Sequence, residues 1–387
     1  MTTRGSLPLP ELEALDLVTE DGRPVVESVE LLPSREVSIA PLAFGDRDFS
    51  ARPVFERPYE GAWREERYRV DPVRLYRLRG AAVHSDCGIV MVKAFRRDSD
   101  EGWFLLLDET LQYLVPKEHG IEFHTDSGLI SLQTNGKSRL PGRAVHLLAG
   151  GGSRNYYHWT MDVVSRLSVL PDACFDDLFL VPPLPQPYHW DMLASVAGDR
   201  AMRVQAVPNC ETVELDELIL IPNIGEFGAR PRPEQLSVFG RVLSGVPTRP
   251  PHRRLYVTRR NAENRKLVNE EAIIGLLAAA GYEILDTDGM PLREQAQRFA
   301  EATHIVAAHG AGLTNLVYCD PSVSVCELQM DLYLNWLFRR IANLRGARYG
   351  CVVGETLGDW EPLRPHNKPW HVSFDRVKST LAGAGFL

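Results

Sequence analysis

The segment Thr303-His-Ile-Val-Ala-Ala-His-Gly-Ala-Gly-Leu-Thr-Asn-Leu316 joins two apolar runs through a pair of glycines. The run before the glycines predicts a buried strand, and the run after them predicts a helix. A strand that leads into a helix through glycines directs backbone N–H groups and the positive end of the helix dipole to one point, which suits a phosphate group. The pattern is neither G-x-G-x-x-G nor a P-loop, so it does not favour a dinucleotide or ATP.

A basic segment lies upstream, between a predicted strand at 255–258 and a predicted helix at 269–280. Its cations are Arg259, Arg260, Arg265 and Lys266. So many positive charges between a strand and a helix suit a diphosphate group. Asn269 is expected to cap the helix, with Glu270 in its first turn.

The C-terminal part of the chain alternates between predicted strands and predicted helices. We expect strands at 255–258, 282–285, 305–308, 323–328 and 348–353. We expect helices at 269–280, 292–301 and 332–344, and one that starts directly after the glycine turn. Short strands linked by crossover helices predict a parallel, doubly wound sheet.

The preceding part of the chain is less regular. Residues 1–65 are rich in Pro and Glu and are expected to form an extended arm. Residues 66–140 contain short β-type runs separated by turn residues, and α/β alternation follows, including a helix expected at 156–170. We therefore divide the chain into an arm at 1–65, a second part at 66–246 and a third part at 247–387.

The composition limits the classes of function. The chain has 387 residues, 24% of them charged, and a net charge of −8, which argues against general nucleic-acid binding. Its six cysteines are scattered without a CxxC pair, which favours reduced thiols over a disulfide framework or a zinc site. No apolar run approaches the ~18 residues of a transmembrane helix, so we expect a soluble protein.

A third cluster, in the predicted helix at 156–170, combines a histidine with a carboxylate. His158 and Asp162 are four residues apart, which places them on one face of a helix, and Asn155 lies where it can cap that helix. A His and a carboxylate side by side can take a proton from a hydroxyl group. The alternative is a hydrogen-bonded structural helix without a catalytic role.

Taken together, these segments resemble glycosyltransferase family 61, whose members include bacterial capsular-polysaccharide proteins, plant xylan-modifying enzymes and O-linked N-acetylglucosamine transferases. The resemblance is carried, in the expected order, by Asn155 to Asp162, Arg259 to Glu270, His309 to Asn315, and Glu327-Leu328. It implies an α/β fold of the GT-B type, with two Rossmann-like domains that face a cleft and a β-rich N-terminal segment. It also implies an inverting transferase whose C-terminal domain holds the nucleotide-sugar donor.

The resemblance also assigns roles to residues of this chain. The donor is expected to contact Arg259, Arg260, Arg265, Asn269, Glu270, His309, Gly310, Ala311, Gly312, Leu313, Asn315 and Glu327. Glu327, at a strand end, is expected to accept the ribose hydroxyls. Asn155 and Tyr157 are expected to position the acceptor. Asp162 is the first choice for the catalytic base because a carboxylate is ionised at neutral pH, and His158 is the alternative.

We expect no metal and no cofactor beyond the nucleotide sugar, for which UDP is the commonest nucleotide in the family. The basic segment and the glycine turn can stabilise the charge of the leaving diphosphate without a divalent ion. Asp286-Thr287-Asp288 has the D-x-D pattern that binds Mn²⁺ in GT-A transferases, but here it falls within a doubly wound domain. We therefore do not assign a metal to it.

These expectations describe a cytoplasmic transferase with a nucleotide-sugar donor and a glycan acceptor, active in surface or capsular polysaccharide synthesis. They include no nucleic-acid partner and no transmembrane segment, and they leave peripheral membrane association open. One alternative is a transferase that acts on a protein or a small metabolite. Another is a non-catalytic protein that binds glycans or nucleotides. A nicotinamide oxidoreductase would need a glycine fingerprint that the chain lacks.

Overall fold

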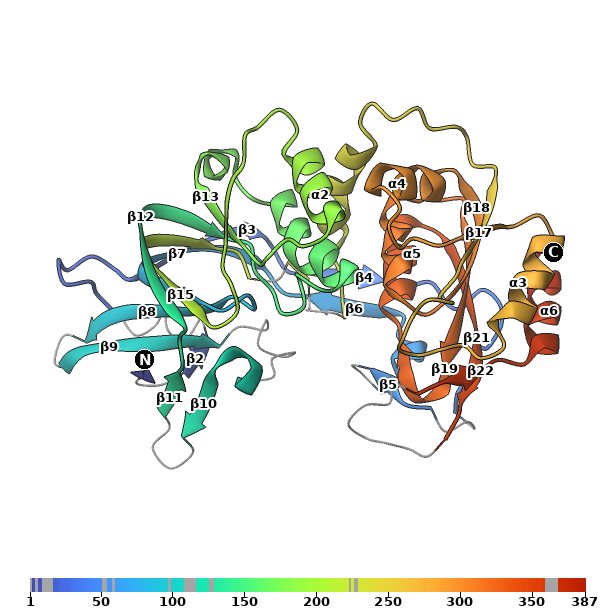
Figure 1. Cartoon of the computed structure of the whole chain (residues 1–387), viewed down its shortest axis with the longest axis horizontal. Coiled ribbons are helices and arrows are strands. Elements are labelled where there is room, and N and C mark those ends of the chain that lie inside the picture. The colour runs from blue at the N-terminus through green and yellow to red at the C-terminus, as the bar shows by residue number, and fades with distance from the viewer. Residues whose placement is uncertain are drawn as a thin grey trace. The chain divides into compact units, whose positions relative to one another are not determined.

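The computed structural model describes residues 2–3, 6–8, 17–50, 54–57, 60–96, 99–107, 116–124, 129–222, 224–225, 229–358 and 368–387. It has a mixed α/β fold and two compact units (Figure 1). Unit 1 comprises Met1–Arg35, Val70–Gly228 and Glu234–Val238, and unit 2 comprises Glu36–Arg69, Ala229–Pro233 and Phe239–Leu387. Within the described ranges, no helix combines the length and the apolar character needed to span a bilayer.

Unit 2 is built on a six-stranded sheet. Its strands, in spatial order, are β17 (Glu283–Leu285), β16 (Arg253–Val257), β18 (Ala302–Ala308), β19 (Ser324–Met330), β21 (Arg348–Thr356) and β22 (Trp370–His371). All neighbouring pairs are parallel except the last, which is antiparallel. The central strands β18 and β19 are mostly buried because helices cover both faces of a parallel sheet, and β19 includes the buried polar residues Glu327 and Gln329. The predicted parallel arrangement of the first five strands is confirmed.

The helices of unit 2 lie on both faces of this sheet (Figure 1). The helices α3 (Glu270–Ala279) and α6 (Phe374–Gly383) cover one face. The other face carries α4 (Leu292–Ala300), the 3₁₀ segment η8 (Ala311–Tyr318) and α5 (Leu337–Arg345). The helix predicted at 332–344 begins later than expected, because η9 (Asp331–Tyr333) and the short strand β20 (Leu334–Asn335) precede it.

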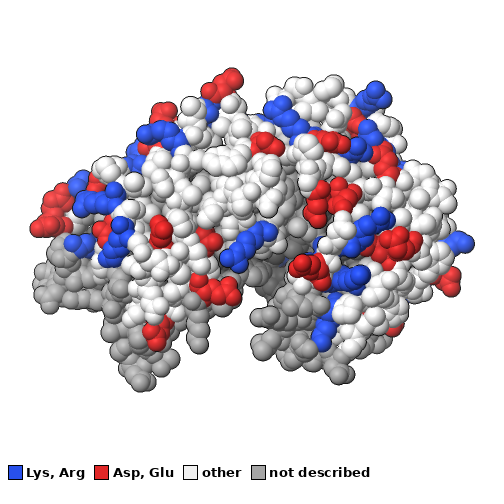
Figure 2. Space-filling model, in the orientation of Figure 1, with Lys and Arg blue, Asp and Glu red and all other residues white. Residues whose placement is uncertain are grey.

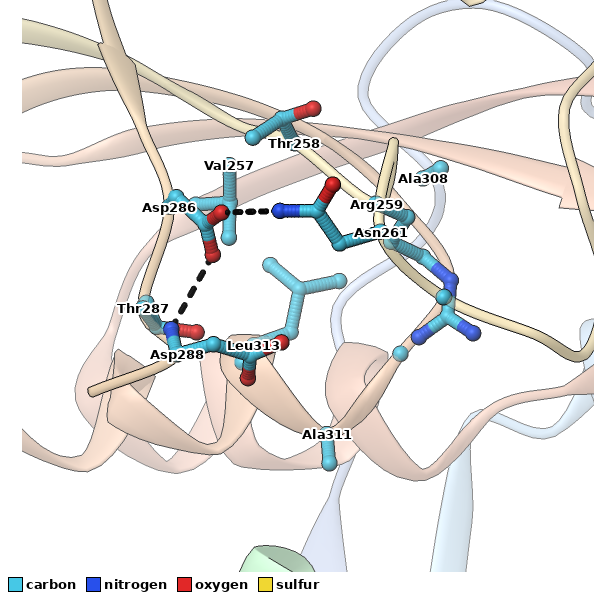
Figure 3. Close-up of a pocket in the computed structure, with 13 residues that line it drawn as sticks. Val257, Thr258, Arg259, Asn261, Asp286, Thr287, Asp288, Ala308, Ala311 and Leu313 are labelled. Atoms are coloured by element: carbon cyan, nitrogen blue, oxygen red, sulfur yellow. Dashed lines mark hydrogen bonds between the residues drawn. The ribbon is translucent and has the colours of Figure 1, made fainter.

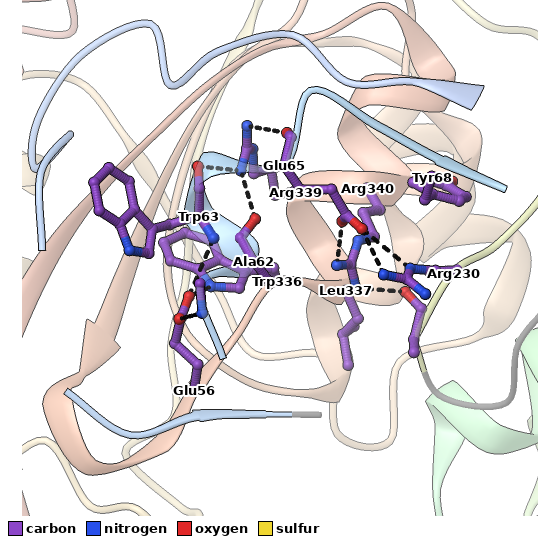
Figure 4. A network of polar contacts seen from close by, with 12 residues as sticks. Glu56, Ala62, Trp63, Glu65, Tyr68, Arg230, Trp336, Leu337, Arg339 and Arg340 are labelled. Carbon is purple, nitrogen blue, oxygen red and sulfur yellow. Dashed lines mark hydrogen bonds and ion pairs between the residues drawn. The ribbon is translucent and has the colours of Figure 1, made fainter. Parts of the chain in front are cut away.

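The N-terminal segment Glu36–Arg69 groups with unit 2, although the sequence divided it between an arm and the second part. It contains β5 (Glu56–Arg57), which pairs with β20, and the 3₁₀ turn η1 (Ala62–Arg64). Glu65 binds Arg340 of α5 at 2.5 Å and Arg230 at 2.7 Å (Figure 4). These partly buried contacts attach the segment to α5 and to Arg230.

Unit 1 contains a nine-stranded mixed sheet. Its path is β14 (Arg203–Ala206), β13 (Leu178–Val181), β12 (Gly136–His146), β15 (Glu211–Leu220), β7 (Val73–His84), β8 (Ile89–Arg96), β9 (Ser99–Leu107) and β2 (Ser6–Pro8). A further strand, β3 (Val26–Leu32), pairs with β7. The strands from β14 to β15 are parallel, whereas β15, β7, β8 and β9 are antiparallel. Because four of its strands pair antiparallel, this sheet is not the all-parallel sheet of a second Rossmann-like domain.

Smaller elements complete the fold. A three-stranded sheet joins β1 (Thr2–Thr3), β11 (Leu129–Leu132) and β10 (Ile121–His124), which follows the 3₁₀ turn η3 (Pro116–His119). A two-stranded sheet pairs β4 (Arg35–Ser38) with β6 (Arg67–Val70). The remaining helical elements are α2 (Pro187–Ala197), η6 (Asp172–Asp176) and η7 (Pro233–Leu243).

The helix predicted at 156–170 is not a regular α-helix. It contains the π-helix η4 (His158–Val163), followed by the 3₁₀ segment η5 (Val164–Ser168). The wider turn buries consecutive residues of η4, from Trp159 to Val163, which a one-sided α-helix would not do. Short π-helical segments are often found at functional sites.

Candidate functional site

The order in which successive strands are added to the sheet of unit 2 reverses at β16. The second strand along the chain, β17, lies on one side of β16, and the third, β18, lies on the other. In open α/β sheets, ligands bind at the carboxyl ends of the strands where the order reverses. A cavity of about 170 Å³ lies there (Figure 3). This volume is below the roughly 300–1,000 Å³ of sites that enclose a whole small molecule, so it would hold part of a larger ligand.

The cavity collects residues from three strand ends. Its lining consists of Val257, Thr258, Arg259, Asn261, Ala262, Asp286, Thr287, Asp288, Ala308, Gly310, Ala311, Gly312 and Leu313. The basic segment after β16 and the glycine turn after β18 are therefore brought together, as the sequence indicated. The acidic segment after β17 joins them.

The Arg259 guanidinium lies against the glycine turn. Its Nη2 donates to the carbonyl oxygen of Asn264 at 2.9 Å. A Cβ at Gly310 would lie 2.1 Å from Arg259 Nη1, so a larger residue there would displace the guanidinium from the turn. The same turn begins η8, and its backbone N–H groups therefore lie beside the guanidinium.

Arg265 is the second half-buried cation of this site. It has a positive φ of 55°, and its guanidinium lies 5.2 Å from the centre of the Tyr333 ring. Burial lowers the pKa of Arg265, and burial followed by repulsion from Arg265 lowers the pKa of Arg259 to about 10. Among the residues described in the structure, no carboxylate forms an ion pair with either guanidinium. Two partly desolvated cations that lack a directly paired carboxylate favour an anionic ligand, although Glu270 and Asp288 lie near enough to Arg259 to oppose the fall in its pKa.

Glu270 holds the strand end from which Arg259 emerges. Its Oε1 accepts hydrogen bonds from Tyr256 Oη at 2.9 Å, Thr258 Oγ1 at 3.0 Å and the Arg259 backbone N–H at 2.8 Å. Glu270 is 5% exposed, so its role in the structure is to position the basic segment. Asn269 does not cap α3 with its side chain, because its amide exchanges hydrogen bonds with the Val372 backbone.

His309 and Glu327 form a buried pair at the ends of neighbouring strands. His309 Nδ1 lies 2.6 Å from Glu327 Oε1, and Tyr349 Oη donates to Glu327 Oε2. Burial lowers the pKa of His309, although the Glu327 carboxylate opposes this shift. Glu327 is fully buried, so the ribose contact expected from the sequence has no exposed oxygen to make it. The Glu327 carboxylate instead orients the His309 ring through its contact with Nδ1.

The other residues predicted for the donor fall into two groups. Ala311, Gly312 and Leu313 line the cavity with Gly310. Asn315 is buried, and its Nδ2 donates to Gln295 Oε1 at 3.0 Å and to the Gly312 carbonyl at 3.1 Å, which supports the turn from behind. Arg260 is exposed and lies 3.5 Å from Glu271 Oε1, and it does not line the cavity.

Sequence reasoning missed the acidic side of the cavity. Asp286 accepts hydrogen bonds from Asn261 Nδ2 at 2.8 Å and from the Asp288 backbone N–H at 3.0 Å (Figure 3). The D-x-D segment, to which the sequence assigned no metal, lines the cavity together with Arg259 and Asn261 of the basic segment. The sequence could have predicted this placement, because the D-x-D segment follows a predicted strand and the carboxyl ends of adjacent parallel strands meet at one edge of a sheet.

The His158–Asp162 pair forms in unit 1 as predicted. His158 Nδ1 lies 2.6 Å from Asp162 Oδ2 within η4. The imidazole lies against the preceding glycine turn, where a Cβ at Gly151 would come within 3.0 Å of the ring. The His158 side chain is 18% exposed and that of Asp162 is 5% exposed. If His158 Nδ1 donates to Asp162, the Nε2 atom carries no hydrogen and can accept one.

The neighbours of this pair have structural contacts. Asn155 Oδ1 accepts a hydrogen bond from the Tyr157 backbone N–H at 2.8 Å, as an N-cap residue does, and Asn155 remains exposed. Tyr157 is 5% exposed, and its ring packs edge-on against His158 at 5.5 Å. Tyr157 therefore contacts the histidine rather than presenting a surface to a ligand.

The charged surface shows no broad basic area on the face drawn in Figure 2. Lys and Arg side chains are interspersed there with Asp and Glu. The net charge is −8, so the paired arginines of the cavity are a local feature of an acidic protein. This distribution favours a small anionic ligand over a polyanion.

Comparison with known proteins identifies the region that carries both clusters. Residues 156–326 match the family model described as glycosyltransferase 61. The matched region includes His158, Asp162, the basic segment and the glycine turn, and it ends one residue before Glu327. No curated protein matches the chain.

Proposed function

We propose that this chain, a glycosyltransferase of family 61, moves a sugar from a nucleotide-sugar donor to a hydroxyl group of a glycan acceptor. Unit 2 binds the donor, with UDP as the expected nucleotide. The observation that carries this proposal is the Arg259–Arg265 pair, which lacks a carboxylate partner among the described residues and lies at the glycine turn. We place the reaction in the cytoplasm, in the synthesis of a surface polysaccharide.

The leaving diphosphate explains why such a pair is useful. Breaking the glycosidic bond develops negative charge on the phosphate oxygens, and preorganised cations and N–H groups stabilise that charge most effectively in a site without water. Arg259, Arg265 and the N–H groups at the start of η8 supply these donors. The acidic side, Asp286 and Asp288, supplies acceptors for hydroxyl groups of the same ligand.

On the acceptor side, we propose His158 Nε2 as the base and Asp162 as the residue that orients it. The sequence favoured Asp162, but the carboxylate is the more buried of the two and is bound to His158 Nδ1. Transfer by a single displacement inverts the anomeric centre, with the acceptor hydroxyl losing its proton to His158 as the new bond forms.

Two measurements on the full chain test the proposed function. Isothermal titration calorimetry with UDP, GDP, CMP and their sugar conjugates is expected to show binding of one nucleotide class. Release of free nucleotide from the matching sugar nucleotide is expected in the absence of acceptor, because most transferases hydrolyse some donor. Binding without any hydrolysis or transfer would favour the non-catalytic alternative, and no binding of any nucleotide would overturn the proposal.

The base assignment makes the first specific prediction. His158→Ala and Asp162→Asn are each expected to lower turnover by about 100-fold or more, because general base catalysis contributes about 10²–10⁴ in rate. Nucleotide affinity is expected to stay within about twofold, since ground-state donor binding is separate from proton transfer. Asp172→Asn is the control, because its side chain is 85% exposed.

The relative effects separate the two residues. If Asp162→Asn abolishes turnover and His158→Ala retains most of it, Asp162 is the base. If both variants stay fully active, η4 has only a structural role and the base lies elsewhere.

Metal independence makes the second prediction. Transfer is expected to continue in EDTA, because the cationic pair can stabilise the leaving group without a divalent ion. Turnover is measured with EDTA and after addition of Mn²⁺ or Mg²⁺. Complete loss of turnover at an unchanged Tm, restored by Mn²⁺, would instead assign Asp286 and Asp288 to a catalytic metal.

A further inference from the structure

A second polar cluster lies in unit 1, outside the residues assigned to transfer. Asp86 and Cys87 occupy the turn between β7 and β8, and His119 ends η3. One potential ligand atom from each residue lies within 4.8 Å of the other two. The cluster is enclosed, since the side chains of Asp86 and His119 are 12% and 15% exposed and Cys87 is 2% exposed.

The polar contacts of this cluster converge on a single nitrogen, His119 Nδ1. His119 Nδ1 lies 3.0 Å from Asn209 Oδ1 and 3.3 Å from Asp86 Oδ1. It also lies 2.8 Å from Ser85 Oγ, which donates to Asn209 Oδ1. Because the Ser85 hydroxyl serves Asn209 Oδ1, a hydrogen on His119 Nδ1 can serve the Asp86 carboxylate, and a metal ion bound at Nδ1 would take the place of that hydrogen.

The backbone holds these side chains in place before any ligand binds. Ser85 N donates to the Glu211 carbonyl at 2.8 Å, and Asn209 Nδ2 donates to the Glu118 carbonyl at 2.9 Å. His84 Nε2 lies 2.8 Å from the His119 carbonyl oxygen. Three separate stretches of the chain are thereby fixed around one point, as preorganised metal sites require.

We propose that Asp86, Cys87 and His119 bind a structural zinc ion. Thiolate, imidazole and carboxylate form a donor set that suits Zn²⁺, which prefers tetrahedral coordination. Cys210 is the fourth candidate ligand, since its Sγ lies 3.6 Å from both Asn209 Oδ1 and the Glu118 carbonyl oxygen. Binding releases the thiol proton of each ligating cysteine to solvent, and His119 binds as the neutral imidazole.

The sequence disfavoured this site because the cysteines show no CxxC spacing. In the folded protein, the candidate ligands come together from positions that are far apart along the chain. A zinc ion here would attach η3 to the β7–β8 turn and to the residues before β15. This role is independent of the donor site in unit 2.

Metal analysis of the full chain tests the proposal directly. Protein produced with zinc in the medium is expected to retain about one equivalent after gel filtration, with removal by a strong chelator lowering the Tm and zinc restoring it. Replacement by Co²⁺ is expected to produce visible bands of tetrahedral cobalt and a thiolate charge-transfer band in the near ultraviolet. A chelator-induced loss of transfer that zinc alone restores, together with the Tm, belongs to this site and not to the donor site.

Variants separate a zinc site from a hydrogen-bonded cluster. Cys87→Ser is expected to lose the zinc and the cobalt charge-transfer band, whereas Cys174→Ser, at another buried cysteine of unit 1, retains both. Asp86→Asn is the milder variant if Cys87→Ser fails to fold, and it is expected to release zinc to a competing chelator more readily. Cys210→Ser distinguishes three protein ligands from four through the intensity of the cobalt bands.

Two results would overturn the proposal. The first is a purified protein without zinc whose Tm is unchanged by added Zn²⁺. The second is a Cys87–Cys210 disulfide, seen as the loss of two reactive thiols under denaturing, non-reducing conditions.

Discussion

Two pairs of arginines in unit 2 differ in whether carboxylates and carbonyl oxygens surround their guanidinium groups. Arg339 and Arg340 of α5 are almost fully buried, and their terminal nitrogens donate to backbone carbonyls and to Glu65 (Figure 4). Arg259 and Arg265 are also desolvated, but no carboxylate pairs with them in the part of the chain that the structure describes. The first pair uses its charge to hold the fold together, and the second keeps its charge available for a ligand.

The difference shows how the two roles can be separated experimentally. Removing one member of a satisfied pair leaves buried partners without a hydrogen bond and costs stability. Removing one member of an unsatisfied pair relieves repulsion and desolvation, so it costs binding rather than stability. Each of the following experiments tests this distinction.

The largest effect is expected for Arg340→Met. The substitution removes the guanidinium that binds Glu65 at 2.5 Å and the Ala229 carbonyl at 2.9 Å. Loss of one partner of a buried pair costs about 3–5 kcal/mol, which should appear as a lower free energy of unfolding in urea. Arg293→Met, at an exposed position of α4, is the control and should stay within about 0.5 kcal/mol. Equal stability of the two variants would mean that the α5 network contributes nothing.

A smaller effect, on nucleotide affinity and not on the free energy of unfolding, is expected for Arg265→Ala. Nucleotide affinity should fall about 10-fold or more, because a charged hydrogen bond contributes roughly 1.5–3 kcal/mol. The free energy of unfolding should not fall, since the guanidinium donates no hydrogen bond to a buried acceptor among the residues that the structure describes. Arg260→Ala is the matched control, as its side chain pairs with Glu271 on the surface, and calorimetry should show affinity within about twofold. A destabilised Arg265→Ala with normal affinity would place Arg265 with the structural pair.

The smallest effect concerns His309, whose pKa burial lowers from the usual 6.5. As the pH falls below 6.5, the unfolded chain binds a proton that folded His309 resists, so folding stability falls with pH until His309 itself is protonated. One such group contributes at most about 1.4 kcal/mol per pH unit. Urea unfolding between neutral and mildly acidic pH should show a shallower slope for His309→Gln. An identical slope would mean that His309 is not held neutral.

The sheet of unit 2 could be predicted from the sequence because its signals are local. Strands such as β18 are short apolar runs, and the residues that follow them begin turns and helices. Parallel strands bring their carboxyl ends to one edge, so the meeting of Arg259 with Gly310 followed from the pattern alone. The same rule would have included Asp286, had its D-x-D pattern not been compared with a different fold.

The remaining features depend on contacts that local patterns do not encode. The buried role of Glu327 comes from the register that pairs it with Ala307 and with Cys351, and from the Tyr349 hydroxyl of the next strand. The π-turn at His158 depends on the burial of consecutive residues, which an α-helical pattern cannot indicate. The clustering of Cys87 with His119 requires the folded β7–β8 turn and η3 together.

The pairing of Glu65 with Arg340 also has a consequence for synthesis on the ribosome. The two residues are 275 positions apart, so Glu65 emerges long before its partner is translated. At about 5–20 residues per second, that interval lasts roughly 15–55 seconds. During this time the N-terminal segment has no α5 to bind, and the nascent chain must keep it out of other contacts. Unit 2 can therefore be completed only when translation nears its end. A fragment that begins at residue 239 would lack a part of the core of unit 2.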